Sequence, residues 1–336
     1  MVYKMAISNQ IKLGLFIPFQ IPSIICHIFL IYHLIFNRQL RQALHNHVIL
    51  TFLITNYLLI TFDLSMAYYF LNHDPIKENS GNFCLAWNFI DSFLSSLSIF
   101  LMMWASFERH LFIFYDRQIF NNKLKRFIFH YIPIIILIIY TFIFYFIAIY
   151  ISPYCSNSEH FDFNEVFCDR SCYIHHVIIL SSIDLIIHKV FCSILIFSLN
   201  LFLLIRIFYE KRQRNQIIRW RRHKRMTIQI LSISTLYFIG TLPSAISESL
   251  HVFVDGDYND EEFMIQREVF LYLFYLTSLI IPFICLMSFP EIYQKLRFLP
   301  CSKRPPNIVF KIAYSAHRNQ VDIPVLNRKR ATMEPA

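Results

Sequence analysis

Long apolar stretches alternate with short polar segments along most of the chain. Seven of these stretches reach the length of about 20 residues that an α-helix needs to cross a hydrocarbon layer about 30 Å thick. They span residues 13–36, 48–71, 83–107, 127–151, 177–205, 226–254 and 269–290. Runs such as Ile132–Ile139 lack the two-residue alternation of membrane β-strands. The pattern therefore predicts an all-α membrane protein, a seven-transmembrane helix bundle.

The composition favours a lipid environment over water. Of the 336 residues, 56% are hydrophobic and 16% are charged, and the chain contains 36 Phe and 19 Tyr but only 4 Gly. Ordinary soluble domains are roughly half apolar and about a quarter charged, so the composition excludes most soluble classes. The first apolar run is as long as the later ones and lacks a small-residue cleavage pattern, which indicates a signal anchor.

The net charge of +9 is distributed unevenly among the connections. The segments that follow the first, third, fifth and seventh spans carry 24 of the 31 Lys and Arg, whereas the opposite side carries 5 of them and 12 acids. Because basic connections lie on the cytoplasmic side, the N-terminus is predicted outside and the C-terminus inside. Topology and lipid contact account for the positive charge, so no nucleic-acid partner is expected.

This topology divides the chain into three parts. Residues 1–12 form an extracellular N-terminal tail, 13–290 the seven-transmembrane bundle, and 291–336 a cytoplasmic amphipathic helix and tail. Cys301 follows the predicted amphipathic helix beside two basic residues and is a candidate for lipidation by position. No phosphate-binding Gly loop, zinc-protease motif or serine nucleophile motif occurs in the sequence, so no enzyme, cofactor or metal site is predicted.

Charged residues within a bilayer are costly and are therefore the first candidates for function. Glu108, Arg109 and His110 stand at the cytoplasmic end of the third span, and Cys84 stands 25 residues before Arg109. A helix of that length rises about 38 Å, so Cys84 and Arg109 mark opposite faces of the membrane. An arginine found alone at this depth would be interpreted as one that extends to the lipid headgroups.

Seven spans with the N-terminus outside, Cys84 at the outer end of the third span and Glu108-Arg109 at its inner end resemble the rhodopsin-like, or class A, G-protein-coupled receptors. The 25-residue separation is the spacing of that family. The resemblance implies a receptor in the plasma membrane that transmits an extracellular signal to a heterotrimeric G protein. It also implies that Glu108 holds Arg109 in the inactive state, with His110 in place of the family's usual Tyr.

Other landmarks of the family are altered here. Pro243 and Pro282 match the prolines of the sixth and seventh spans, but the residues around them differ from the family pattern. The departures are Asn56 for Asp, Cys192 for Pro, Thr241 for Trp, Ile281 for Asn and Cys285 for Tyr. The family holds a sodium ion with the Asp that Asn56 replaces, so the sodium site is in doubt.

Asp91 is the candidate ligand-binding residue of the third span. It lies about two helical turns from Cys84 and 18 residues from Arg109, on nearly the same helix face. In amine-binding members of the family an Asp at this position pairs with the ligand, and Tyr275 matches a Tyr that hydrogen-bonds it. The implied pocket is lined by Asp91, Asp184, Glu248 and Tyr275. A cationic amine or a short peptide is the expected ligand, and an internal pair of Asp91 with Lys189 or a hydroxyl is an equal alternative.

Three cysteines, Cys155, Cys168 and Cys172, stand in the predicted extracellular loop before the fifth span. Together with Cys84 they face an oxidising compartment, which favours disulfides. A bridge from Cys84 to Cys172, or to Cys168, would tether the third span to this loop, and the remaining two would close a loop within it. Zinc bound by Cys168, Cys172 and neighbouring histidines is the competing interpretation.

Two other interpretations compete with the receptor. A multi-span transporter or channel is the first, but no internal repeat is evident, and an odd number of spans in a chain with four Gly fits that class poorly. A receptor relative that has lost signalling is the second, and it is motivated by the altered landmarks in the second, sixth and seventh spans.

Overall fold

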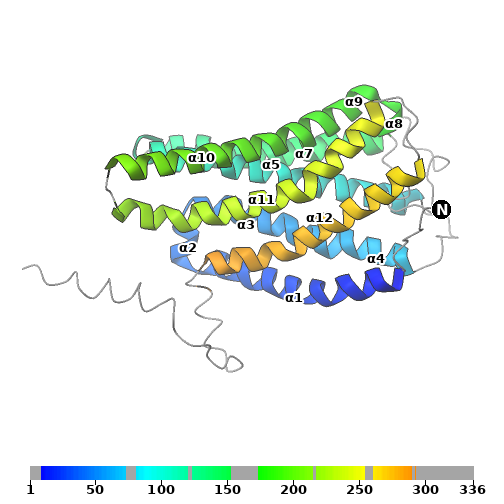
Figure 1. The fold of residues 1–336 in the computed structure, drawn as a ribbon, viewed down its shortest axis with the longest axis horizontal. Coiled ribbons are helices and arrows are strands. Elements are labelled where there is room, and N and C mark those ends of the chain that lie inside the picture. Colours follow the sequence, from blue (N-terminus) through cyan, green and yellow to red (C-terminus); the bar gives the residue numbers. More distant parts are fainter. Residues whose placement is uncertain are drawn as a thin grey trace, which may run out of the picture. The chain divides into compact units, whose positions relative to one another are not determined.

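A computed structural model of the chain describes residues 9–72, 81–119, 123–152, 173–214, 217–253, 260–289 and 292. All of them belong to the first of the two units into which the chain divides, Met1–Ile292. Every secondary-structure element in this described part is helical (Figure 1). The predicted tail at 291–336 lies almost entirely outside these residues, as does Cys301, so both stay predictions.

The first two predicted spans are helices. Helix α1 covers Asn9–Phe36 and is followed by the short α2, Arg38–Gln42. The second span is one continuous helix in three parts: α3 (His45–Leu58), the π-helical turn η1 (Leu59–Asp63) and α4 (Leu64–Asn72). Apolar segments form helices in lipid because each backbone polar group then finds its partner within the same segment.

The third and fourth predicted spans follow. Helix α5, Gly81–Ile119, is 39 residues long and contains no proline. The fourth helix consists of α6 (Lys123–Arg126), η2 (Phe127–Tyr131), α7 (Ile132–Phe146) and η3 (Ile147–Ile151). The third span was predicted to end at residue 107, but the helix continues to Ile119, about three turns further.

The remaining elements complete the set. They are α8 (Tyr173–His176), α9 (Ile178–Ser182), the π-helical segment η6 (Ile183–Phe191), α10 (Cys192–Arg214), α11 (Ile217–Phe253) and α12 (Asp260–Ser288). The segments α9, η6 and α10 form the fifth predicted span. The nine residues of η6 are wound more widely than an α-helix, which changes the direction in which its side chains point.

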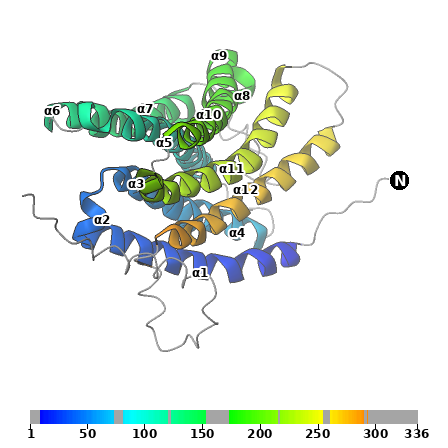
Figure 2. The ribbon, with the colours of Figure 1, turned by 60° about the vertical axis from the view of Figure 1, so that its left-hand side comes forward.

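Helix α5 has the most neighbours among these elements. It packs against α3, α7, α10 and α11, and it also touches η1 and η6. Helix α1 packs against α3 and α12, and α11 lies between α10 and α12 (Figure 2). The first and last long helices therefore lie side by side although they are far apart in sequence.

Six of the described helical segments are long and apolar enough to cross a membrane: 16–36, 46–69, 81–112, 124–151, 178–206 and 265–288. Helix α11, which contains the predicted sixth span 226–254, is not among them. Its described part includes several Ser and Thr together with Glu248 and His251, and these lower its hydropathy. The all-helical architecture was predicted correctly, and the seventh crossing stays a prediction.

Large apolar side chains cover the outer surface of several helices. On α7, the exposed set is Ile135, Ile136, Ile139, Tyr140, Phe142, Ile143 and Phe146. An apolar surface of this extent is unusual in water and is suited to contact with lipid tails. The polar groups of the bundle are instead found between the helices, where two regions concentrate them.

Candidate functional site

A cavity of about 870 Å³, which includes space open to solvent, lies among α5, α8, η6, α11 and α12. Its charged lining residues are Asp91, Asp184, Lys189, Glu248 and Arg267. Three of the four predicted ligand residues therefore come together at one site. We call the end of the helices that holds this cavity the cavity end, and the opposite end of α5 the Arg109 end.

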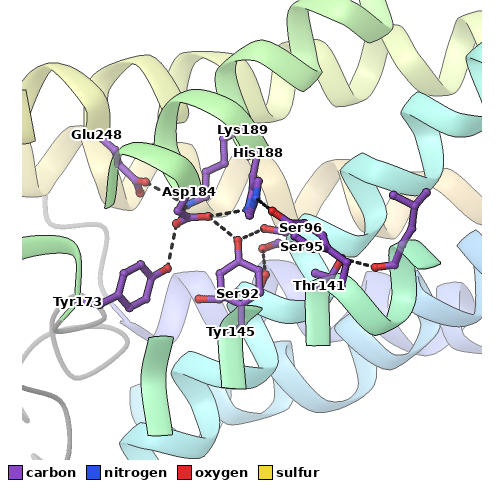
Figure 3. A network of polar contacts seen from close by, with 12 residues as sticks. Ser92, Ser95, Ser96, Thr141, Tyr145, Tyr173, Asp184, His188, Lys189 and Glu248 are labelled. Atoms are coloured by element: carbon purple, nitrogen blue, oxygen red, sulfur yellow. Dashed lines mark hydrogen bonds and ion pairs between the residues drawn. The ribbon is translucent and has the colours of Figure 1, made fainter. Parts of the chain in front are cut away.

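Asp184 is the most extensively paired carboxylate at the cavity (Figure 3). Its side chain is 1% exposed. Tyr145 donates its hydroxyl hydrogen to Oδ1, Tyr173 donates to Oδ2 over 2.9 Å, and Lys189 Nζ lies 3.8 Å from Oδ2. A buried carboxylate is tolerated when donors and a cation satisfy it in this way. We call these four residues, together with Glu248, the Asp184 cluster.

The donors of the Asp184 cluster are held in place by burial and by ion pairs. Burial, reinforced by the negative charge of Asp184, raises the pKa of the Tyr173 phenol well above its ordinary value, so this hydroxyl remains a donor. Lys189 also donates to Glu248 Oε2 over 3.3 Å and so lies between two carboxylates (Figure 3). Lys189 had been considered as a partner of Asp91; in the structure its ion pairs are with Asp184 and Glu248.

Asp91 lines the same cavity from α5, and no hydrogen bond or ion pair to its carboxylate is formed among the described residues. Lys189 and Arg267 are the cations that act on it electrostatically, and Asp184 and Glu248 are the acids. Counted together, the lining holds three acidic and two basic side chains. The cavity thus carries one carboxylate more than its own cations can neutralise.

Tyr275, the fourth predicted ligand residue, lies outside the cavity lining. It donates to Asp63 Oδ2 over 2.7 Å, and Trp87 Nε1 donates to Asp63 Oδ1 over 2.8 Å. All three side chains are 0% exposed. The resemblance implied a bond from Tyr275 to Asp91, and the structure has Asp63 in that place. Trp87 was missed in the sequence, although Asp63 is the single charged residue of the second predicted span and signalled a buried partner.

Asn56, which takes the position of the family's sodium ligand, is satisfied within the protein. Its Nδ2 donates to His27 Nε2 over 3.0 Å and to the Ser278 carbonyl over 2.8 Å. His27 Nδ1 in turn donates to the Ser23 carbonyl over 2.9 Å, which assigns the acceptor role to Nε2. Neutral donors, not carboxylates, fill this position, and no cluster of three metal-ligating side chains occurs in the described part of the chain.

At the Arg109 end, two of the predicted switch residues, Glu108 and Arg109, are buried and His110 is half-buried, and the three are arranged differently from the expectation. Glu108 is hydrogen-bonded to His130 Nδ1 of η2, with the two side chains 2% and 0% exposed. The described residues include no ion pair between Glu108 and Arg109. Successive side chains on a helix point about 100° apart, and here Glu108 points toward η2.

Arg109 is 4% exposed, and its Nη2 atom is buried without a hydrogen-bond partner among the described residues. His110 Nε2 lies 3.0 Å from the Leu199 carbonyl of α10, an acceptor, so this nitrogen donates. A buried guanidinium nitrogen without a partner is costly, and Arg109 is therefore the group at this end that most needs an additional acceptor.

Among the cysteines, Cys84 is disulfide-bonded. Cys26, Cys192 and Cys285 are buried free thiols in the helices, in line with a packing role. The loop cysteines Cys155, Cys168 and Cys172 lie outside the described residues, so the choice of partner for Cys84 stays a prediction.

Comparison with known proteins gives the family. The model of the 7 transmembrane receptor (rhodopsin family) matches residues 27–284, which is more than half of the chain and includes both Asp91 and Arg109. No curated protein matches the sequence. The match extends from α1 into α12 and so includes the helices that line the cavity. The chain therefore belongs to the rhodopsin family of seven-transmembrane receptors.

Proposed function

We propose that this protein is a G-protein-coupled receptor of the plasma membrane, in which all seven long helices cross the bilayer with the N-terminus outside. The family, the apolar outer surface and the concentration of Lys and Arg in alternate connections support this topology. In this orientation the cavity end is extracellular and the Arg109 end faces the cytoplasm. A ligand that enters the cavity and a G protein at Arg109 then bind at opposite ends of α5.

The ligand is proposed to be a cationic amine, either a small molecule or the amino group of a short peptide. The observation that carries this proposal is the unequal pairing of the cavity carboxylates: Asp184 is saturated by two hydroxyls and Lys189, whereas Asp91 receives no such donor from the described residues. An ammonium group would supply the missing positive charge and hydrogen bonds.

Binding of amines to the purified protein tests this assignment. Primary and quaternary amines, each matched with an uncharged isostere, are expected to raise the unfolding temperature of the wild type, whereas the isosteres are not. Asp91→Asn should lose this shift. Ser95→Ala is the matched control, because Ser95 lines the same cavity one helical turn away and bonds within its own helix. Equal shifts in the wild type and Asp91→Asn would rule out pairing at Asp91.

The proposed output is contact between Arg109 and the G protein. Because Glu108 is already held by His130, Arg109 forms no ion pair with Glu108, and its buried Nη2 finds no acceptor in the part of the chain that the structure describes. Ligand binding would change the packing of α11, whose Glu248 is linked to the cavity through Lys189, and so favour an open state at the Arg109 end.

The disulfide of Cys84 is proposed to join α5 to the loop before the fifth span, with Cys172 as the partner and Cys168 as the alternative. Both are close in sequence to α8, whose Tyr173 packs at the cavity. The bridge would then hold the cavity wall near α5. Peptide mapping of the non-reduced protein by mass spectrometry identifies the partner.

A panel of G-protein activation sensors tests the receptor function. Cells that express the wild type are expected to give a basal or amine-stimulated signal, and Arg109→Ala should abolish it. Arg41→Ala is the control, since Arg41 is an exposed basic residue at the same end. Identical signals from the wild type and Arg109→Ala, at equal expression, would contradict signalling through Arg109.

A further inference from the structure

Three titratable side chains at the Arg109 end form one continuous chain of hydrogen bonds. His47 Nε2 lies 2.8 Å from the Arg41 carbonyl, and His47 Nδ1 lies 3.1 Å from His130 Nε2. His130 Nδ1 is hydrogen-bonded to Glu108. The chain begins at a carbonyl in α2, passes through α3 and η2, and ends at a carboxylate in α5.

The number of hydrogens that His47, His130 and Glu108 share follows from the groups at the two ends of this series of hydrogen bonds. A carbonyl only accepts, so His47 Nε2 must carry a hydrogen. If His47 is neutral, its Nδ1 accepts and His130 Nε2 must donate to it. His130 is then either doubly protonated, donating from Nδ1 to an ionised Glu108, or neutral and accepting at Nδ1 from a protonated Glu108. If His47 instead is doubly protonated, its Nδ1 donates to a neutral His130, which donates to an ionised Glu108.

Every arrangement that completes the chain contains one proton more than an ionised Glu108 and two neutral imidazoles. When that proton is removed, two acceptor atoms must face each other, either between the two imidazoles or between His130 and Glu108, and one link is lost. We propose that Glu108, His130 and His47 form a proton-dependent lock that joins α5, η2 and α3 beside Arg109.

The side chains around Glu108, His130 and His47 do not exchange protons near neutral pH. The other groups that face them are Tyr131 of η2, whose hydroxyl lies 3.3 Å from His47 Nδ1, Arg126 of α6, which acts on His47, Arg41 of α2, and Arg109, which acts on Glu108. Arginine does not titrate near neutral pH, and tyrosine titrates well above it. Histidine is the side chain that gains or loses a proton in this range.

The direction in which stability changes with pH follows from the number of protons that the complete lock contains. The lock is complete at mildly acidic pH, and it loses a link as the pH rises and the shared proton leaves. The stability that it contributes therefore decreases with rising pH. Its consequence for signalling rests on the proposed function: a rise in cytoplasmic pH would release α5 from η2 and α3 and favour the active state.

Thermal unfolding of the purified full-length protein in detergent tests the lock without ligand or G protein. Between about pH 6 and about pH 8 the unfolding temperature of the wild type is expected to fall, by about 2–4 °C more than that of His130→Gln. A Gln at this position can donate to Glu108 and to His47 without a titrating proton. His33→Gln is the control: among the described residues His33 is hydrogen-bonded to the Phe29 carbonyl of its own helix alone, so the pH slope of this variant should match that of the wild type.

His47→Gln provides a second variant in case His130→Gln does not fold. It replaces the outer imidazole with a non-titrating amide, and it too should reduce the pH slope. Equal slopes in the wild type and the folded variants, or an equal loss of slope in His33→Gln, overturns the lock. A slope that depends on His130 supports the lock even where the sensors detect no signal from the wild type, so failure of the receptor function and failure of the lock are distinguishable.

Discussion

The cavity end and the Arg109 end hold their buried carboxylates by different chemistry. At the cavity end, Asp184 accepts from Tyr145 and Tyr173 and lies beside Lys189, groups that keep their protons throughout the neutral range. At the Arg109 end, the partner of Glu108 is the imidazole of His130, a group that can hold either one or two hydrogens. His188 Nδ1 also lies 3.8 Å from Asp184 Oδ1, but the hydrogen bonds of Asp184 come from two phenols, whereas the hydrogen bond of Glu108 involves an imidazole.

The two regions nevertheless share one arrangement on α5. In each, the group that could have paired with a charged residue of α5 is already paired elsewhere: Lys189 pairs with Asp184 and Glu248 instead of Asp91, and Glu108 pairs with His130 instead of Arg109. Asp91 then receives no donor and Arg109 Nη2 no acceptor from the described residues. Unpaired charged groups inside a membrane protein are costly and indicate function. The difference in chemistry predicts that pH acts more strongly at the Arg109 end, where an imidazole is hydrogen-bonded to the carboxylate, than at the cavity end.

The largest expected effect is the difference in stability between variants of Asp184, the paired carboxylate of the cavity, and of Asp91, the unpaired one. Asp184→Ala removes the common acceptor of two buried hydroxyls and a counterion of Lys189, and it should lower the free energy of unfolding by about 3–5 kcal/mol. Asp91→Ala should change it far less. Thermal unfolding of both purified variants measures the difference, and equal losses would show that the two carboxylates are paired to the same degree.

A second substitution tests the contact of α11 and α12 between the two regions. A Cβ atom added at Gly240 would lie 2.9 Å from Thr277 Oγ1 of α12. Gly240→Ala should therefore force the helices apart and cost about 2 kcal/mol of stability, with altered basal signalling. Gly14→Ala is the matched control, because the added Cβ would meet no atom of another helix within 4 Å among the described residues. Equal stability of both variants would mean that Thr277 moves away freely.

A smaller effect distinguishes the two ends by their response to pH. Tyr145→Phe removes one donor to Asp184 and should lower stability by about 1 kcal/mol. Because the group removed is a phenol hydroxyl, which keeps its hydrogen near neutral pH, this loss should be about the same at about pH 6 and about pH 8, in contrast to that of His130→Gln. Unfolding curves at both pH values provide the comparison. A loss that varies with pH would place a titrating proton at the cavity end as well.

The smallest effect is expected for Ser95→Ala. Ser95 lines the cavity, but its hydroxyl donates only to the Ser92 carbonyl of the same helix, over 3.4 Å. The change in stability should be about 0.5 kcal/mol or less. A larger loss in the same unfolding assay would indicate that the hydroxyls of this wall, and not Asp91 alone, define the site.

Much of the fold follows from the sequence because charges disappear wherever a helix crosses lipid. The apolar runs predicted the long helices in order, and the Cys84 to Arg109 spacing predicted an uninterrupted third helix. The π-helical segments were not predicted, since no periodicity marks them. One of them, η6, carries both Asp184 and Lys189 to the cavity wall.

The partners of the charged residues were predicted less well than their positions. Asp91, Asp184 and Glu248 meet at one cavity, as expected. Glu108 was expected to bind its neighbour Arg109, yet it pairs with His130, which is 22 residues away in sequence and on another helix. Such pairs depend on the rotation of each helix about its axis, which a pattern of apolar residues determines only to within about one side chain.

The most direct test of the central claim changes residues at the cavity end and measures G-protein activation, which is proposed to occur at the Arg109 end. Concentration–response curves for G-protein activation by cationic amines would be recorded in cells that express the wild type, Asp91→Asn or Ser95→Ala at equal surface levels. Loss of a charged hydrogen bond at Asp91 should lower the potency of an activating amine by about tenfold or more, and Ser95→Ala should leave it within about twofold. Unchanged potency in Asp91→Asn would contradict the claim that an amine at Asp91 controls the Arg109 end.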